Sequence, residues 1–110
     1  MITSSTNAKV KQVVQWREKA RERHRDRVFI AEGFKMFEEA PEEGIQEVYV
    51  SSDALAAGKN HAFMREKLER TGYELVSPQV LAKMSDTKTP QGILTVVRQP
   101  RYEFSELLKA

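Results

Sequence analysis

Apolar residues recur at helical spacing along several stretches of the chain. Within residues 8–23, Val10 and Val13 begin an apolar stripe that predicts an α-helix packed on a hydrophobic core. Arg17 and Arg21 lie further along the same stripe, so the end of this helix is expected to project beyond the core. Shorter helices are predicted at residues 34–40 and 78–84, and over residues 53–71, where residues 58–60 interrupt the pattern.

Four runs rich in β-branched and aromatic residues alternate with the predicted helices. They predict strands at residues 28–30, 45–50, 73–76 and 93–97, of which the last is the most apolar. Strands that alternate with helices form largely parallel or mixed sheets covered on both faces. The predicted fold is therefore α/β: a three-layer α/β/α sandwich with a four-stranded, mostly parallel or mixed sheet, formed by residues 1–99 as one domain.

The composition is that of an ordinary globular domain. The 110 residues are 40% hydrophobic and 31% charged, which suits a folded protein rather than a disordered segment. No stretch is long and apolar enough to cross a bilayer, and the first residues lack the apolar core of a signal peptide, so a cytoplasmic location is expected. The absence of cysteine excludes disulfides, thiol catalysis and thiolate metal sites within the chain.

Positive charge is concentrated at the start of the chain. Residues 1–30 contain eight Lys and Arg against three Asp and Glu, whereas the other eighty residues contain ten against thirteen. Nucleic acids are bound mainly through Lys and Arg that replace counterions at the phosphates, so this asymmetry favours contact with a polyanion. The most basic run, residues 17–27, presents a comb of arginines at Arg21, Arg23, Arg25 and Arg27.

A solvated helix face is the competing interpretation of this basic run. Glu18 could pair with Arg21, and Glu22 with Arg25, at the spacing that brings side chains together on a helix. Such pairs would compensate part of the positive charge without any ligand.

A polar loop at residues 85–92 (SDTKTPQG) precedes the last predicted strand. Its hydroxyls, amide and cation could receive a phosphate or a ribose, or dock a neighbouring domain. It lacks the glycine spacing of a P-loop, and the alternative interpretation is a structural turn shaped by Pro90 and Gly92. The candidate RNA contacts in the loop are Lys88, Thr89 and Gln91.

No catalytic or metal-binding pattern occurs in the sequence. His24 and His61 are not spaced as a metal-binding pair with nearby carboxylates. The motifs G-x-S-x-G, H-E-x-x-H and G-x-G-x-x-G are all absent. No catalytic, cofactor-binding or metal-binding residue is therefore predicted in the chain.

Three spaced segments carry a family resemblance. The first is Ile2-Thr3-Ser4 with Asn7-Ala8-Lys9-Val10-Lys11, and the second is Lys19-x-Arg21 followed by Arg27-x-Phe29-Ile30-x-Glu32-Gly33. The third is residues 85–92, followed by a valine-rich strand. In this order, and over nearly the whole chain, they resemble the SpoU/TrmH family of RNA ribose 2′-O-methyltransferases, in particular 23S ribosomal RNA enzymes of the thiostrepton-resistance type.

The resemblance implies a division of labour between two domains. In this family the N-terminal domain resembles ribosomal proteins that bind kinked RNA, and it recognises the substrate. A knotted C-terminal domain binds S-adenosylmethionine, forms the homodimer and carries the catalytic arginine. The motifs of that second domain are absent here, so no catalysis is expected from this chain alone, and it is expected to be monomeric. By resemblance, RNA contacts fall at Lys9, Lys11, Lys19, Arg21 and Arg27.

The leading hypothesis is the RNA substrate-binding domain of a methyltransferase, with ribosomal RNA preferred over transfer RNA and no membrane partner. Residues 100–110 are then a linker or the start of the catalytic domain, because their apolar residues have nothing after them to pack against. The alternatives are a stand-alone, non-enzymatic RNA-binding protein of the kink-turn type and a protein-interaction module. The predicted RNA-binding residues are Asn7, Lys9, Lys11, Arg17, Lys19, Arg21, Arg23, Arg25, Arg27, Lys88, Thr89 and Gln91.

Overall fold

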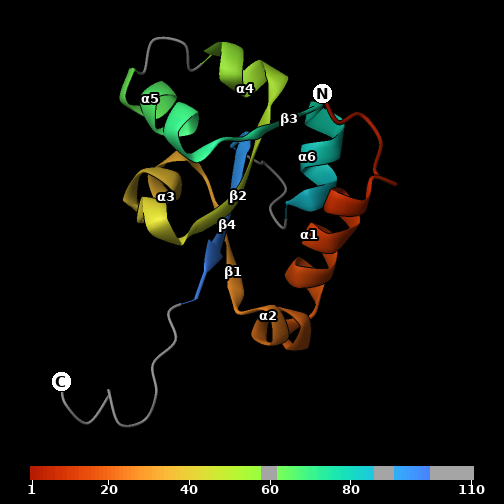
Figure 1. Cartoon of the computed structure of the whole chain (residues 1–110). Coiled ribbons are helices and arrows are strands. Elements are labelled where there is room, and N and C mark those ends of the chain that lie inside the picture. Colours follow the sequence, from red (N-terminus) through yellow and green to blue (C-terminus); the bar gives the residue numbers. More distant parts are fainter. Residues whose placement is uncertain (58–61, 86–90, 100–110) are drawn as a thin grey trace, which may run out of the picture.

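Helices and strands alternate in the computed structural model, which describes residues 1–57, 62–85 and 91–99 (Figure 1). All four predicted strands are present, and the shorter helices lie where the sequence predicts them, within one or two residues. The elements are α1 (Ala8–Glu18), α2 (Ala20–Asp26), β1 (Val28–Glu32), α3 (Phe34–Glu39), the 3-10 turn η1 (Glu42–Gly44), β2 (Ile45–Ser51), α4 (Ser52–Ala57), α5 (Ala62–Thr71), β3 (Glu74–Val76), α6 (Pro78–Met84) and β4 (Ile93–Arg98).

The four strands form one mixed sheet in the order β1-β4-β2-β3. The most apolar strand, β4, lies inside the sheet and runs antiparallel to both neighbours, whereas β2 and β3 are parallel. A central strand is covered on both faces, which explains why β4 shows a continuous apolar run rather than an alternating one. The predicted α/β fold with a mixed four-stranded sheet is confirmed.

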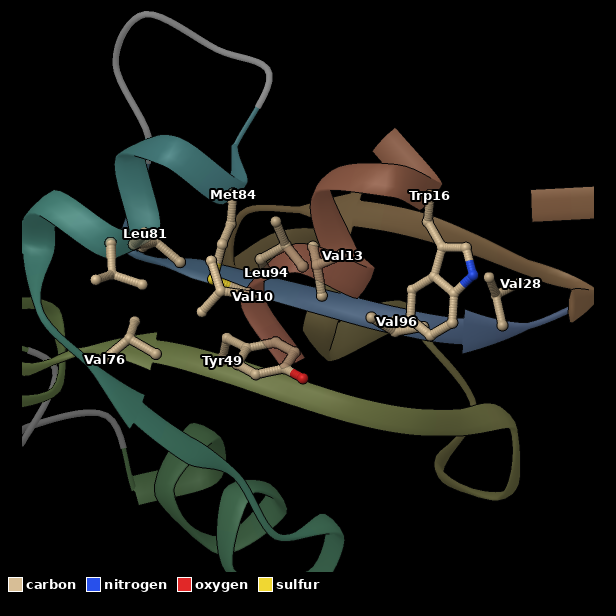
Figure 2. Packing of buried hydrophobic residues seen from close by; sticks show 11 residues of the cluster. Val10, Val13, Trp16, Val28, Tyr49, Val76, Leu81, Met84, Leu94 and Val96 are labelled. Atoms are coloured by element: carbon tan, nitrogen blue, oxygen red, sulfur yellow. The ribbon is translucent and has the colours of Figure 1, made fainter. Parts of the chain in front are cut away.

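The two faces of the sheet carry separate hydrophobic clusters. On one face, Val10 and Val13 of α1 pack with Leu81 and Met84 of α6 (Figure 2). On the other face, Phe37 of α3 packs with residues of α5, β2 and β4. Figure 1 shows the same layers, with α1 and α6 on one side of the sheet and α3 and α5 on the other. Each fully buried large side chain contributes about 1.5–3 kcal/mol through the hydrophobic effect.

A buried lysine joins α5 to the end of α3. The Lys67 side chain is only 3% exposed, and its Nζ donates to the carbonyls of Phe37, Glu38 and Ala40 at 2.7, 3.0 and 2.6 Å. The last carbonyls of a helix have no intrahelical donor, and a cation there also meets the negative end of the helix dipole. Lys67 of α5 therefore supplies the hydrogen-bond donors that the last carbonyls of α3 lack.

The first predicted helix is interrupted, which corrects the expectation of one helix over residues 8–23. Lys19 has an extended backbone (φ −122°, ψ 107°) between α1 and α2. The interruption is stabilised because Nη1 of Arg23 donates to the carbonyls of Trp16 and Arg17 at 2.5 and 2.9 Å. These carbonyls belong to the last turn of α1, so a side chain from α2 supplies the donors that a continuous helix would have supplied.

The strand register separates two ends of the sheet. Val28, at the start of β1, lies opposite Arg98, at the end of β4. Glu32, at the end of β1, lies opposite Leu94, near the start of β4. The basic helix α2 therefore lies at one end (Figure 1). Gln91 and Gly92, which directly precede β4, lie at the other end, beside Ala54 of α4. Within the described residues, no helix combines the length and apolar character that a membrane crossing requires.

Candidate nucleic-acid interface

Three exposed cations surround the short helix α2. Lys19 precedes the helix, Arg21 lies in its first turn, and Arg27 follows it with a left-handed φ of 57°. Over residues 1–57, 62–85 and 91–99, the ion pairs leave these three side chains without a carboxylate partner. Their positive charges are therefore available to phosphate groups.

Arg98 adds a fourth exposed cation at this end of the sheet. The antiparallel register places it opposite Val28 and so beside Arg27. Gln99 fixes the junction, since its backbone N–H donates to the Arg27 carbonyl at 2.7 Å and its side-chain amide to the Val28 carbonyl at 3.1 Å. Sequence reasoning missed Arg98 because only the strand register reveals its neighbours. We call Lys19, Arg21, Arg27 and Arg98 the basic end.

Two arginines of the predicted RNA-binding set donate hydrogen bonds to backbone carbonyls at the C-terminal ends of helices. Arg23 caps the last turn of α1, as described above. Nη2 of Arg17 lies 3.4 Å from the carbonyl of Lys83, in the last turn of α6, and 3.4 Å from a carboxylate oxygen of Glu18. The structure thus gives Arg17 and Arg23 intramolecular roles that the sequence did not predict.

Arg25 is compensated by carboxylates of its own helix. Its guanidinium lies 2.5 Å from Glu22 and 3.2 Å from Asp26. The Glu22–Arg25 pair expected for a solvated face is therefore present, whereas Glu18 contacts Arg17. Because two carboxylates already compensate its charge, Arg25 is a weaker candidate for phosphate binding than the uncompensated cations of the basic end.

Asp26 ties α2 back to α1 through Trp16. The indole Nε1 of Trp16 donates to Oδ2 of Asp26 at 2.7 Å, while the ring itself is buried in the core. Hydrogen bonds from Arg25 and from Trp16 lower the pKa of the Asp26 carboxyl below its ordinary value. Asp26 therefore stays ionised to a lower pH than a free carboxyl does, and its hydrogen bond to Trp16 links α2 to α1.

We expect Asp26→Asn to remove a pH-dependent contribution to stability. A lowered pKa in the folded state stabilises the protein above the unfolded value of about 4, and this stabilisation is lost as the pH falls through the folded value. The difference in unfolding free energy between the wild type and the variant should therefore be constant at neutral pH and shrink below about pH 4. Urea titrations followed by the fluorescence of Trp16, the single tryptophan, measure it. A difference that stays constant into the acid range would contradict this role, and Glu39→Gln controls for the loss of a surface carboxylate.

The predicted residues at the start of α1 have three different surroundings. Asn7 caps the helix, since its Oδ1 accepts from the Lys9 backbone N–H at 2.9 Å. Nζ of Lys9 lies 2.5 Å from Glu74, in a hollow of about 410 Å³ that Glu47 also lines. The hydrogen bond to Glu74 raises the pKa of Lys9, so this cation is compensated. Lys11 is exposed on the other flank of α1, beside α6.

At the end of the sheet where β4 begins, hydrogen bonds connect residues of the sequence segments that resemble the SpoU/TrmH family. Ser85 donates a hydrogen bond to the carboxylate of Glu32, and the Gly33 N–H donates to the Ile93 carbonyl at 3.1 Å. A Cβ at Gly33 would overlap the Gln91 side chain, and φ there is +98°. These contacts support a structural role for Glu32 and Gly33. Gln91 itself is exposed, and Lys88 and Thr89 lie outside the described residues.

The predicted RNA-binding residues therefore do not form one patch. The basic end lies where β1 begins and β4 ends, whereas Gln91 lies where β1 ends and β4 begins. Among the described residues, no group of three His, Cys, Asp or Glu could hold a metal ion. His24 is exposed on α2, and His61 falls outside the described part of the chain.

The same fold occurs in solved structures of RNA methyltransferases. An RNA 2′-O ribose methyltransferase superposes with a TM-score of 0.69 at 26% identity, over 94% of this chain and 39% of that chain. An rRNA methyltransferase from Sinorhizobium meliloti gives 0.66 at 21%, over 93% and 37%. The SpoU methyltransferase AviRb from Streptomyces viridochromogenes, solved with AdoMet, gives 0.61 at 17%, over 90% and 38%. The chain thus spans less than two fifths of each of these proteins.

The fold is thus shared with one part of larger RNA methyltransferases. The chain belongs to the MRM3-like substrate-binding domain family, whose model matches residues 7–95. No curated protein sequence matches the chain significantly.

Proposed function

We propose that this chain is the RNA-recognition domain of an S-adenosylmethionine-dependent RNA ribose 2′-O-methyltransferase, and that its RNA is ribosomal rather than transfer RNA. The observation that carries the proposal is the basic end: four exposed cations without carboxylate partners among the described residues, on a domain of a substrate-binding family. Lys and Arg of this kind bind the sugar-phosphate backbone and set the position of the RNA, whereas bases are read by other contacts.

The catalytic work is assigned to a second domain of the parent enzyme. Residues 1–99 form the recognition domain in this proposal, and residues 100–110 lead toward the domain that binds S-adenosylmethionine and forms the homodimer. The chain alone is therefore proposed to be a cytoplasmic, monomeric RNA-binding domain without methyl-transfer activity.

Binding to RNA over a salt series tests the proposal. The chain is titrated with ribosomal RNA fragments and transfer RNA, with duplex DNA as competitor. Roughly three to six phosphate contacts give a slope of log affinity against log salt between about −2 and −5. The proposal predicts such a slope and a preference for one ribosomal RNA fragment. Failure to bind any RNA at low salt would contradict it and would favour a protein-docking module.

A further inference from the structure

A basic groove runs between α1 and α6, away from the basic end. It has a volume of about 670 Å³. The described residues of its walls include the cations Lys11, Arg17 and Lys83 and one carboxylate, Glu18. The two helices that form it pack side by side on one face of the sheet (Figure 1). Lys83 was not among the residues that the sequence pointed to, because it stands alone in a short helix.

The two flanks of α1 have opposite electrostatic character. The hollow on the flank facing β2 and β3 contains Lys9 with Glu47 and Glu74, and its lysine is paired. Among the described residues, the groove on the α6 flank has three cations and one carboxylate. A polyanion that approaches α1 is therefore repelled from the first flank and attracted to the second.

The polar side chains that line the groove are suited to contact with an RNA sugar-phosphate backbone. Arg17 is half-buried in the wall, with its guanidinium directed at the Lys83 carbonyl and at Glu18. Lys11 and Lys83 are exposed, and over the described residues neither lysine has a carboxylate partner. Ser5 and Gln15 add a hydroxyl and an amide to the same lining, groups that also bind phosphate and ribose oxygens.

We propose that the α1–α6 groove is a second binding site for the RNA sugar-phosphate backbone, with Lys11 and Lys83 as its phosphate contacts. This inference rests on the proposed function and extends it from the basic end to a separate surface. The sugar-phosphate chain then runs along the outside of α1, so one RNA engages both the groove and the basic end.

The test compares the 110-residue chain carrying Lys11→Gln and Lys83→Gln with the wild type. The probes are the ribosomal RNA fragment that binds best and transfer RNA. If each lysine neutralises one phosphate, the slope of log affinity against log salt becomes less negative by about 1.6, and affinity at 0.1 M salt falls about 40-fold. Glutamine is a good helix former, so circular dichroism and thermal melting are expected to be unchanged.

Two further variants separate the outcomes. Lys11→Arg with Lys83→Arg keeps both charges and should retain the slope, whereas Lys35→Gln removes an exposed charge on α3, across the sheet, and should leave binding unchanged. Unaltered affinity and slope in the Lys11→Gln/Lys83→Gln variant, with RNA binding by the wild type intact, would overturn the groove proposal and leave the proposed function standing. Absence of RNA binding by the wild type would overturn both.

Discussion

Replacing Lys67 by methionine is expected to lower the free energy of unfolding by about 3 kcal/mol, or on the order of 15 °C in melting temperature. The change removes the ammonium that satisfies three carbonyls at the end of α3 but keeps most of the buried stem. Buried acceptors without a donor carry a large desolvation cost, and hydrogen bonds from charged groups are the stronger kind. Lys67 also lies with Nζ 5.1 Å from the centre of the Phe37 ring, so its loss removes a cation–π contact as well.

Thermal and urea denaturation of the two forms measure this effect. Lys35→Met, at an exposed position of α3, is the matched control and should change the unfolding free energy by less than about 0.5 kcal/mol. A Lys67→Met variant as stable as this control would show that water satisfies the α3 carbonyls equally well.

The double variant Arg21→Gln/Arg27→Gln is expected to bind RNA about 40-fold more weakly at 0.1 M salt. Each phosphate contact contributes about −0.8 to the slope of log affinity against log salt, so one contact raises the affinity roughly sixfold when the salt falls from 1 M to 0.1 M. The loss of two contacts therefore lowers the affinity at 0.1 M salt by about 40-fold. The slope itself should become less negative by about 1.6. Both side chains are exposed, and no ion pair of the described residues involves them, so the melting temperature should stay within a few degrees.

Arg23→Gln is the informative comparison for this double variant. Arg23 stands between the same two arginines in the sequence, but its guanidinium binds the carbonyls of Trp16 and Arg17. We expect this variant to lose about 1–2 kcal/mol of stability and to keep its RNA affinity when folded. Equal losses of RNA affinity in the Arg23 variant and the double variant would mean that the run acts as one undifferentiated comb of charge.

The alternation of helices and strands was readable from the sequence because local patterns determine it. The apolar run of β4 and the stripe through Val10 and Val13 each report which face is buried. The break at Lys19 was not readable, because residues 8–23 carry a helical pattern throughout. It arises when Arg23 reaches back to the last turn of α1, a contact that the spacing of apolar residues does not encode.

The candidate interface was only partly predictable for a related reason. The charge count located the basic segment, but it could not distinguish cations that complete helix ends, such as Arg17 and Arg23, from the uncompensated Arg21 and Arg27. That distinction depends on which helix ends lie within reach of each side chain. Arg98 was missed because strand register alone brings it to Arg27.

Mapping of the RNA-binding surface of the chain by NMR is the most direct test of RNA recognition through the basic end. The ¹⁵N-labelled chain is titrated with the ribosomal RNA fragment, and shifts of backbone amides are followed residue by residue. We predict the largest shifts from Lys19 to Val28 and at Arg98, with a second group at Lys11 and Lys83, and small shifts across α3 and α5. Shifts concentrated on α3 and α5, with the basic end unaffected, would contradict RNA recognition through this surface.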